Sequence, residues 1–97
     1  MKFYKRDKEL LLAVCDKDIN GLLIRHNGVN IRVKSEFYGK EDFTEAELMH
    51  ELRRCTSINA FGENVCNLLL KLEIIHPASV LWMNNGDQKV GHVIVVR

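Results

Sequence analysis

The segment Phe43-Thr44-Glu45-Ala46-Glu47-Leu48 marks the start of a helix and is the clearest local signal in the chain. The Thr44 hydroxyl can accept a hydrogen bond from the Glu47 backbone N–H while the Glu47 side chain reaches back to Thr44, which is a capping box. Phe43 and Leu48 occupy the two positions of a hydrophobic staple. The apolar residues that continue at helical spacing are Leu52 and Cys55, with Met49 beside them. The pattern predicts an amphipathic helix.

A second helical pattern runs from about Gly62 to Leu72. The residues of its apolar face are Val65, Leu68, Leu69 and Leu72. Pro77 prevents the helix from continuing, because proline lacks the N–H donor and restricts the residue before it. Residues 57–62 connect the two helical patterns, and the sequence leaves two alternatives open for them, a kink or a break between helices.

Strand patterns lie on both sides of the helical region. The predicted strands are Lys2–Arg6, Glu9–Cys15, Asn30–Lys34, Val80–Met83 and Val90–Val96, with Leu22–Arg25 as a short strand or a connector. Asn85-Gly86 between two apolar runs is a strong hairpin signal. Because strands are segregated from the helical pair, we expect an α+β fold, with a small antiparallel or mixed sheet of about five strands and two α-helices packed on one face. Residues 1–97 are expected to form a single domain.

Composition and charge exclude several classes of protein. The net charge is +1, from 14 basic and 13 acidic residues, whereas a dedicated nucleic-acid clamp carries a strong basic excess. The basic residues gather near the amino terminus and the acidic ones between residues 36 and 51. The three cysteines show no metal or disulfide spacing. No secretion signal or membrane-spanning run is recognisable, so we expect a cytoplasmic protein.

Four segments, in order along the chain, resemble an uncharacterised archaeal family known as domain of unknown function 424. They are Val14-Cys15-Asp16 continuing to Gly21, Glu36-Phe37-Tyr38-Gly39, Ile58-Asn59-Ala60-Phe61-Gly62-Glu63, and His92-Val93-Ile94-Val95-Val96-Arg97. This chain departs from the family pattern around His92, where Gly91 and Val93 replace a proline and a small residue. The resemblance implies a small intracellular archaeal protein and carries the expectation of an RNA-related or translation-related role, without an established activity.

One group of residues is a candidate ligand or anion site. Its members are Asp16, Asn59, Gly62, Glu63 and His92. A glycine at a helix start lets a ligand approach free backbone N–H groups, which attract anions. Histidine can act as a base, a metal ligand or a stacking surface. The structural alternatives are an Asx turn at Asp16, a helix cap at Asn59 and a hydrogen-bonded histidine within the core.

A second group is a candidate RNA-binding surface. Its members are Lys2, Lys5, Arg6, Lys8, Arg32, Lys34 and Tyr38. Lysine and arginine neutralise phosphates, and an exposed tyrosine can stack on an unpaired base. If Phe37 and Tyr38 end a strand, alternation predicts that Phe37 is buried and Tyr38 is partly exposed. The four histidines show no zinc-binding spacing, and no metal or cofactor is expected.

Three classes of function follow from these patterns. The leading hypothesis is a non-catalytic module that docks on RNA or on a ribonucleoprotein partner, which requires its basic residues to form one face. The second is a protein–protein interaction module or homodimer, pairing Val90–Val96 as an exposed edge strand. The third is a small enzyme or ligand binder, and whether the protein is an enzyme stays open. That third hypothesis requires Asp16, Asn59, Glu63 and His92 to converge on one pocket.

Overall fold

The computed structural model describes all 97 residues of the chain, which form seven strands and three α-helices. The strands are β1 (Lys2–Arg6), β2 (Glu9–Cys15), β3 (Leu23–His26), β4 (Val29–Arg32), β5 (Ser57–Phe61), β6 (Leu81–Asn85) and β7 (Gln88–Val96). The helices are α1 (Ser35–Tyr38), α2 (Glu45–Leu52) and α3 (Glu63–Lys71). Two single 3₁₀ turns cover Lys17–Ile19 and Pro77–Ser79. None of the helices has the length and apolar character needed to cross a membrane.

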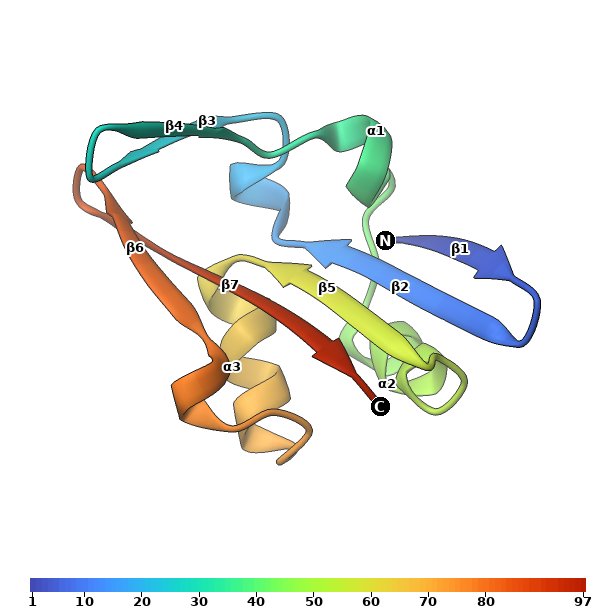
Figure 1. Cartoon of the computed structure of the whole chain (residues 1–97). Coiled ribbons are helices and arrows are strands. Elements are labelled where there is room, and N and C mark those ends of the chain that lie inside the picture. Colours follow the sequence, from blue (N-terminus) through green and yellow to red (C-terminus); the bar gives the residue numbers. More distant parts are fainter.

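The main sheet has five strands in the order β1-β2-β5-β7-β6, and β3 and β4 form a separate two-stranded hairpin (Figure 1). Strands β2 and β5 run parallel, whereas the other neighbouring pairs are antiparallel. The sheet is therefore mixed, and the predicted α+β class with a sheet of about five strands is confirmed.

The connection between the two helical patterns is neither a kink nor a break between helices. Residues Ser57–Phe61 form β5, the central strand of the sheet, which pairs with β2 on one side and with β7 on the other. Ile58 and Ala60 are fully buried on the face that the helices cover. Serine, asparagine and alanine have low strand propensity, so only burial between two neighbouring strands accounts for this conformation.

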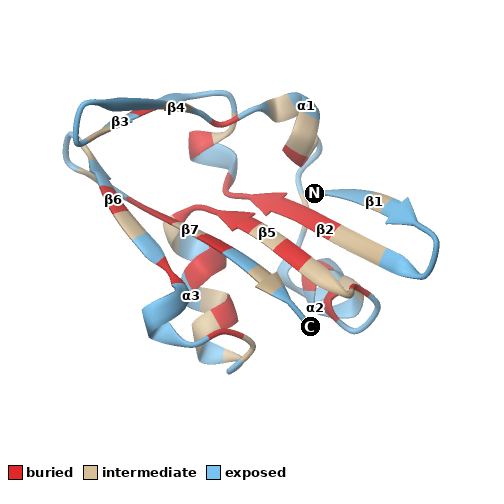
Figure 2. Ribbon diagram, viewed as in Figure 1, coloured by how far each residue is buried: buried red, intermediate tan, exposed pale blue.

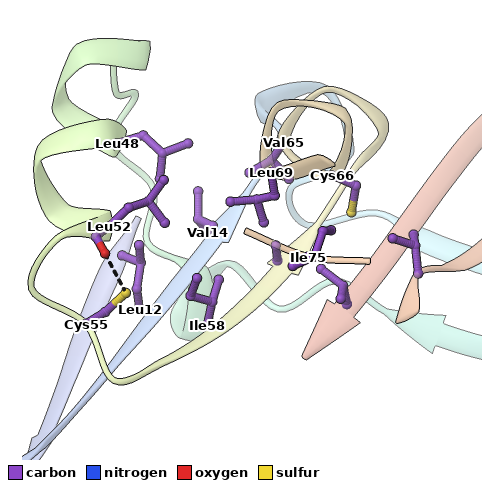
Figure 3. Close-up of a cluster of buried hydrophobic side chains, with 13 residues drawn as sticks. Leu12, Val14, Leu48, Leu52, Cys55, Ile58, Val65, Cys66, Leu69 and Ile75 are labelled. Carbon is purple, nitrogen blue, oxygen red and sulfur yellow. Dashed lines mark hydrogen bonds between the residues drawn. The ribbon is translucent and has the colours of Figure 1, made fainter. Parts of the chain in front are cut away.

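Helices α2 and α3 both pack on one face of the main sheet, as predicted. Leu48 and Leu52 of α2 and Leu69 of α3 meet Leu12 and Ile58 of the sheet in the larger hydrophobic core (Figure 3). Each of these side chains is at most 4% exposed. Burying one leucine or isoleucine side chain contributes about 1.5–3 kcal/mol, so this layer supplies much of the stability of the fold.

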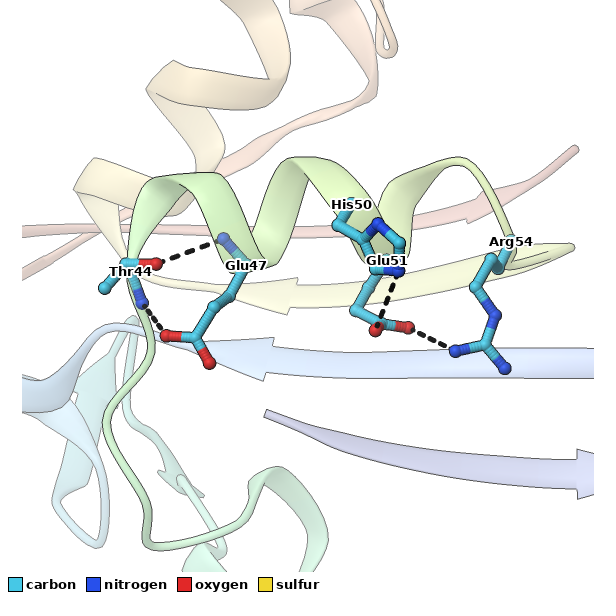
Figure 4. Close-up of polar contacts among 5 residues, drawn as sticks. All are labelled: Thr44, Glu47, His50, Glu51 and Arg54. Carbon is cyan, nitrogen blue, oxygen red and sulfur yellow. Dashed lines mark hydrogen bonds and ion pairs between the residues drawn. The ribbon is translucent and has the colours of Figure 1, made fainter.

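The capping box at the start of α2 is present. The Thr44 hydroxyl accepts from the Glu47 N–H at 3.1 Å, and the Glu47 carboxylate accepts from the Thr44 N–H at 3.0 Å (Figure 4). At the other end of α2, Arg54 donates to Glu51 at 3.1 Å, and His50 lies 4.0 Å from the same carboxylate. Local side-chain chemistry therefore fixes where this helix begins.

The opposite face of the sheet is covered at one end only. The β3–β4 hairpin, the first 3₁₀ turn and α1 cover the second hydrophobic core, to which the sheet contributes Cys15, Phe61, Met83 and Val90. Burial along β2 decreases from its carboxyl end toward the β1–β2 turn, and Figure 2 shows the same gradient in colour. Half of this sheet face therefore has no covering layer.

The expectation that Val90–Val96 is an exposed edge strand is wrong. Strand β7 pairs with β5 through residues 92–96 and with β6 through residues 88–92. The two edges of the main sheet are β1 and β6. The two halves of β7 pair with different neighbours, so residues 93–96 have a partner strand on the β5 side only, and the buried apolar positions of β7 are Val90 and Val93.

Candidate functional site

The uncovered half of the sheet face is built from two cross-strand rows and one histidine. Strand register aligns Tyr4, Leu11, Ser57 and Val96 in one row, and Ala13, Asn59 and Ile94 in the next. The following row contains Phe61 and His92. We call the accessible part of this surface the open sheet face; it consists of Tyr4, Leu11, Ser57, Asn59, Leu81, His92, Ile94 and Val96. Ile94 is 63% exposed and Val96 is 84% exposed, so the surface is apolar and open to solvent.

Asn59 lies at the centre of a polar cluster on this face. Its side-chain oxygen accepts a hydrogen bond from the Tyr38 hydroxyl at 2.8 Å and lies 3.0 Å from Nε2 of His92. The three residues come from α1, β5 and β7. The half-buried Asn59 oxygen has two hydrogen-bond partners, so these contacts restrict the side chains of the cluster.

A chain of aromatic rings runs beneath and beside this polar cluster. Tyr4 stacks on Phe37 with ring centroids 5.0 Å apart, and Phe37 meets Tyr38 edge-on at 4.9 Å. Tyr38 contacts Phe61 edge-on at 6.1 Å, and Phe61 lies 4.7 Å from the His92 ring. The outer rings, Tyr4 and His92, are half-buried, and each is backed by a phenylalanine.

The expected exposures of Phe37 and Tyr38 are reversed. Tyr38 is only 6% exposed, whereas Phe37 is half-buried. The strand alternation does not apply, because these residues belong to the short helix α1, in which successive side chains are about 100° apart. Tyr38 therefore belongs to the core and cannot stack on a ligand.

Burial shifts the pKa values of the ionisable groups in this part of the molecule. Burial lowers the pKa of His92, which keeps the imidazole neutral over a wider range of pH. Burial also raises the pKa of the Tyr38 hydroxyl, so the group stays protonated and donates to Asn59. The pKa of Cys15 is raised to about 12 and that of Cys66 to about 12, again by burial. Neither thiol is a nucleophile near neutral pH.

Asp16 lies on the other face of the sheet and caps helix α3. Its two carboxylate oxygens accept hydrogen bonds from the backbone N–H groups of Asn64 at 2.8 Å and of Val65 at 3.0 Å. The sequence predicted an anion site at the N-terminus of α3, around Gly62 and Glu63. The Asp16 carboxylate already occupies this position. An added anion would meet two further negative charges there, Asp16 and Glu63.

The four residues proposed for an enzyme site do not converge. Asp16 and Glu63 lie at the α3 end on the helix-covered side, whereas Asn59 and His92 belong to the open sheet face. Of the four, Asn59 and His92 form a hydrogen bond with each other, and the second partner of Asn59 is Tyr38, which was predicted to belong to the RNA-binding surface. No group of three or more His, Cys, Asp or Glu side chains is arranged to hold a metal ion.

A separate polar cleft lies beyond the carboxyl ends of the parallel strands β2 and β5. It has a volume of about 1090 Å³ and lies between the first 3₁₀ turn and the segment that joins α1 to α2. The acidic residues that line it are Asp16, Asp18, Glu41 and Asp42. Lys17 pairs with Asp42 across exposed surface at 2.9 Å. The cleft is rich in acceptors, which disfavours phosphates and other anions.

The proposed basic residues do not form one face. Lys2 and Arg6 alternate with Lys5 along β1, so Lys5 projects from the opposite side of the sheet. Arg32 belongs to the separate β3–β4 hairpin, where its guanidinium donates to the Gly21 carbonyl at 3.2 Å. Lys34 stands at the start of α1, and Lys8 lies in the β1–β2 turn. Lys2 and Arg6 share the side of β1 that carries Tyr4 on the open sheet face.

The geometry defines a small mixed-sheet α+β protein with a half-covered sheet face and a satisfied polar cluster on it. The model of the family described as protein of unknown function (DUF424) matches residues 4–93, and the chain belongs to this family. The crystal structure of an uncharacterized conserved protein from Methanopyrus kandleri, an archaeon, is similar, with a TM-score of 0.74 and 20% sequence identity over 97% of this chain and 86% of that one. That likeness shows a shared fold. No curated protein matches the chain.

Proposed function

We propose that this protein is a non-catalytic binding module that docks single-stranded RNA on the open sheet face, either free or within a translation-related ribonucleoprotein. The basic residues proposed from the sequence do not share one face, so the proposal keeps only Lys2 and Arg6 beside Tyr4, and one observation carries it. Strand register places two planar rings, Tyr4 and His92, on the same uncovered face as Lys2 and Arg6. Unpaired bases stack on planar side chains, and phosphates pair with neighbouring basic groups.

The rings are supported for stacking. Tyr4 is held by Phe37 at 5.0 Å and His92 by Phe61 at 4.7 Å, so each has one face against the protein. The Tyr4 hydroxyl donates to the Phe37 carbonyl at 2.8 Å, which fixes the ring further. A ring that is already immobilised loses little conformational entropy when a base stacks on it, so this arrangement favours binding.

Two basic residues of this face can pair with a phosphate backbone. Lys2 and Arg6 flank Tyr4 on β1, and Lys8 follows in the adjoining turn, whereas Glu9 lies opposite Arg6 and Lys2 Nζ donates to the Glu36 carbonyl at 3.0 Å. The acidic residues of α2, in contrast, lie on the helix-covered side of the sheet. Such a module neutralises only a few phosphates and binds with a modest dependence on salt.

Strand β1 provides a matched test of this proposal. Lys2→Ala with Arg6→Ala removes charge from the side of β1 that carries Tyr4, whereas Lys5→Ala removes a charge from the opposite side of the same strand. We expect the double variant to weaken binding of a fluorescent single-stranded RNA several-fold and to reduce the salt slope, and Lys5→Ala to change neither by a comparable amount. Tyr4→Leu, which keeps an apolar side chain but removes the ring, should weaken binding at every salt concentration. The proposal fails if the native protein shows no salt-dependent binding, or if Lys5→Ala alone matches the double variant.

The exposed aliphatic residues of the open sheet face favour a second candidate, a protein–protein interaction. Ile94 at 63% and Val96 at 84% exposure are the two most exposed large hydrophobic side chains of the chain. Contiguous exposed apolar surface is typical of interaction sites. Sedimentation at high concentration tests whether the partner is a second copy, and Ile94→Glu should then shift the equilibrium to monomer.

A cytoplasmic location is proposed as well, because all three cysteines are free and buried.

A further inference from the structure

The hydrogen bonds at Asn59 determine which nitrogen of His92 carries the proton. The Asn59 side-chain oxygen receives the Tyr38 hydroxyl at 2.8 Å and lies 3.0 Å from His92 Nε2. A carbonyl oxygen can only accept, so Nε2 must donate. In a neutral imidazole the other nitrogen is then an acceptor with a free lone pair. The cluster therefore leaves Nδ1 of His92 unprotonated.

The Nδ1 atom of His92 has no hydrogen-bond partner within the chain and is not fully buried. The Asn20 side-chain oxygen is the only buried side-chain nitrogen or oxygen that lacks a hydrogen-bond partner. His92 Nδ1 also has no partner, so it is not buried. Burial of the rest of the ring lowers the pKa of His92, and no charged side chain contributes to that shift. Nδ1 of His92 therefore remains an unprotonated acceptor at neutral pH. The residue lies at the boundary between the covered and the uncovered part of the sheet face.

We infer that Asn59 is a positioning residue that holds His92 as the Nε2–H tautomer, so that Nδ1 accepts a hydrogen bond from the exocyclic amino group of an RNA base. The inference rests on the proposed function and adds a ligand class to it, since adenine and cytosine carry such an amino group. Uracil presents a carbonyl oxygen at the corresponding position, and two acceptors facing each other repel. The site should therefore prefer adenine or cytosine over uracil.

The size of the preference follows from a single hydrogen bond. One neutral hydrogen bond changes an equilibrium by about three- to tenfold. The lone pair of Nδ1 lies in the plane of the imidazole, so the base that it binds lies beside the ring, and a neighbouring base stacked on an aromatic ring of this face adds affinity without distinguishing bases, because every base has a π face. We therefore expect oligo(A) and oligo(C) to bind about three- to tenfold more tightly than oligo(U) of equal length.

The tautomer can be tested without RNA. Nitrogen-15 NMR of the free protein should show a protonated Nε2 and an unprotonated Nδ1 at His92. Asn59→Asp retains an oxygen that accepts from both partners and should keep this signature, whereas Asn59→Ala removes the acceptor and should give a mixture of tautomers. A native protein with the proton on Nδ1, or an Asn59→Ala variant with an unchanged tautomer, overturns the inference.

Base preference is then measured by titrating oligo(A), oligo(C) and oligo(U) at about pH 8, above the range in which imidazole titrates. His92→Phe keeps a planar ring and removes Nδ1, so it should bind the three oligonucleotides alike. Asn59→Ala should reduce the preference and Asn59→Asp should restore it. Equal binding of all three by the native protein overturns the inference while the proposed function stands. Absence of binding to any of them refutes the proposed function, and the NMR result then shows separately whether Asn59 sets the tautomer.

Discussion

The carboxylate of Asp16 occupies the space that a side chain on Gly62 would need. A Cβ atom added to Gly62 would lie 2.4 Å from the Asp16 carboxylate, and Gly62 has φ 130° and ψ 152°, a backbone conformation that is nearly restricted to glycine. The close approach lets Asp16, at the end of β2, reach the first N–H groups of α3. A single aspartate–glycine contact thus joins the parallel strand pair to the helix that follows it.

Gly62→Ala should therefore destabilise the fold more than alanine at another glycine with positive φ. Gly21 is the matched control, because its φ is 87° and a Cβ there would meet nothing within 4 Å. Both variants carry backbone strain, but only Gly62→Ala also collides with Asp16. We expect Gly62→Ala to lower the free energy of unfolding by at least about 2 kcal/mol more than Gly21→Ala. Urea denaturation measures the difference, and equal losses would contradict this account.

Removal of the Asp16 carboxylate should weaken the start of α3. Asp16→Ala leaves two N–H groups without a partner in a nearly buried position, and the expected loss is about 2–4 kcal/mol. Asp16→Asn keeps one carbonyl acceptor and should lose about half as much. Asp18→Ala, which removes an exposed hydrogen bond to Gln88, should change the free energy of unfolding by less than about 0.5 kcal/mol. A similar loss for Asp16→Ala and Asp18→Ala would show that the cap contributes little.

Local patterns predicted the parts of the fold that local chemistry determines. The capping box at Thr44 and Glu47 marks the start of α2, and the turn at Asn85-Gly86 lies between β6 and β7. These signals depend on residues within a few positions of one another, and so they could be found in a single sequence. The amphipathic stripes also predicted correctly that both longer helices lie on the same face of the sheet.

Strand β5 and the Asn59 cluster depend on distant partners, so no local pattern could identify them. Ser57–Phe61 is a strand because it lies between β2 and β7, more than 30 residues away on either side. Asn59 was among the candidates chosen from the sequence, but its contact with Tyr38 depends on α1, where the sequence pattern predicted the end of a strand. Tyr4 was not among the predicted site residues, because its stacking on Phe37 joins residues that are far apart in the sequence.

The Tyr38 hydroxyl should contribute through its hydrogen bond, and the ring through packing. Tyr38→Phe removes the donor to Asn59 and keeps the contacts with Phe37 and Phe61. We expect it to lower the free energy of unfolding by about 0.5–1.5 kcal/mol. Tyr38→Ala removes the ring from the core as well and should cost about 3–5 kcal/mol. Thermal or urea unfolding separates the two variants, and equal losses would mean that the ring packing is unimportant.

Stability should fall when His92 is forced to take up a proton. Burial lowers the pKa of His92 in the folded protein below its ordinary value of 6.5, so the unfolded chain binds a proton at a higher pH than the folded one. The contribution of neutral His92 is therefore fully present above pH 6.5 and is lost as the pH falls through the folded pKa. In His92→Phe this pH-dependent loss should disappear, which urea unfolding over a range of pH would measure.

Asn59→Asp places a negative charge beside the imidazole and should raise the pKa of His92, which NMR titration of the ring would measure. A His92 midpoint at or above the ordinary value in the native protein would show that the ring is more accessible to water than the structure indicates.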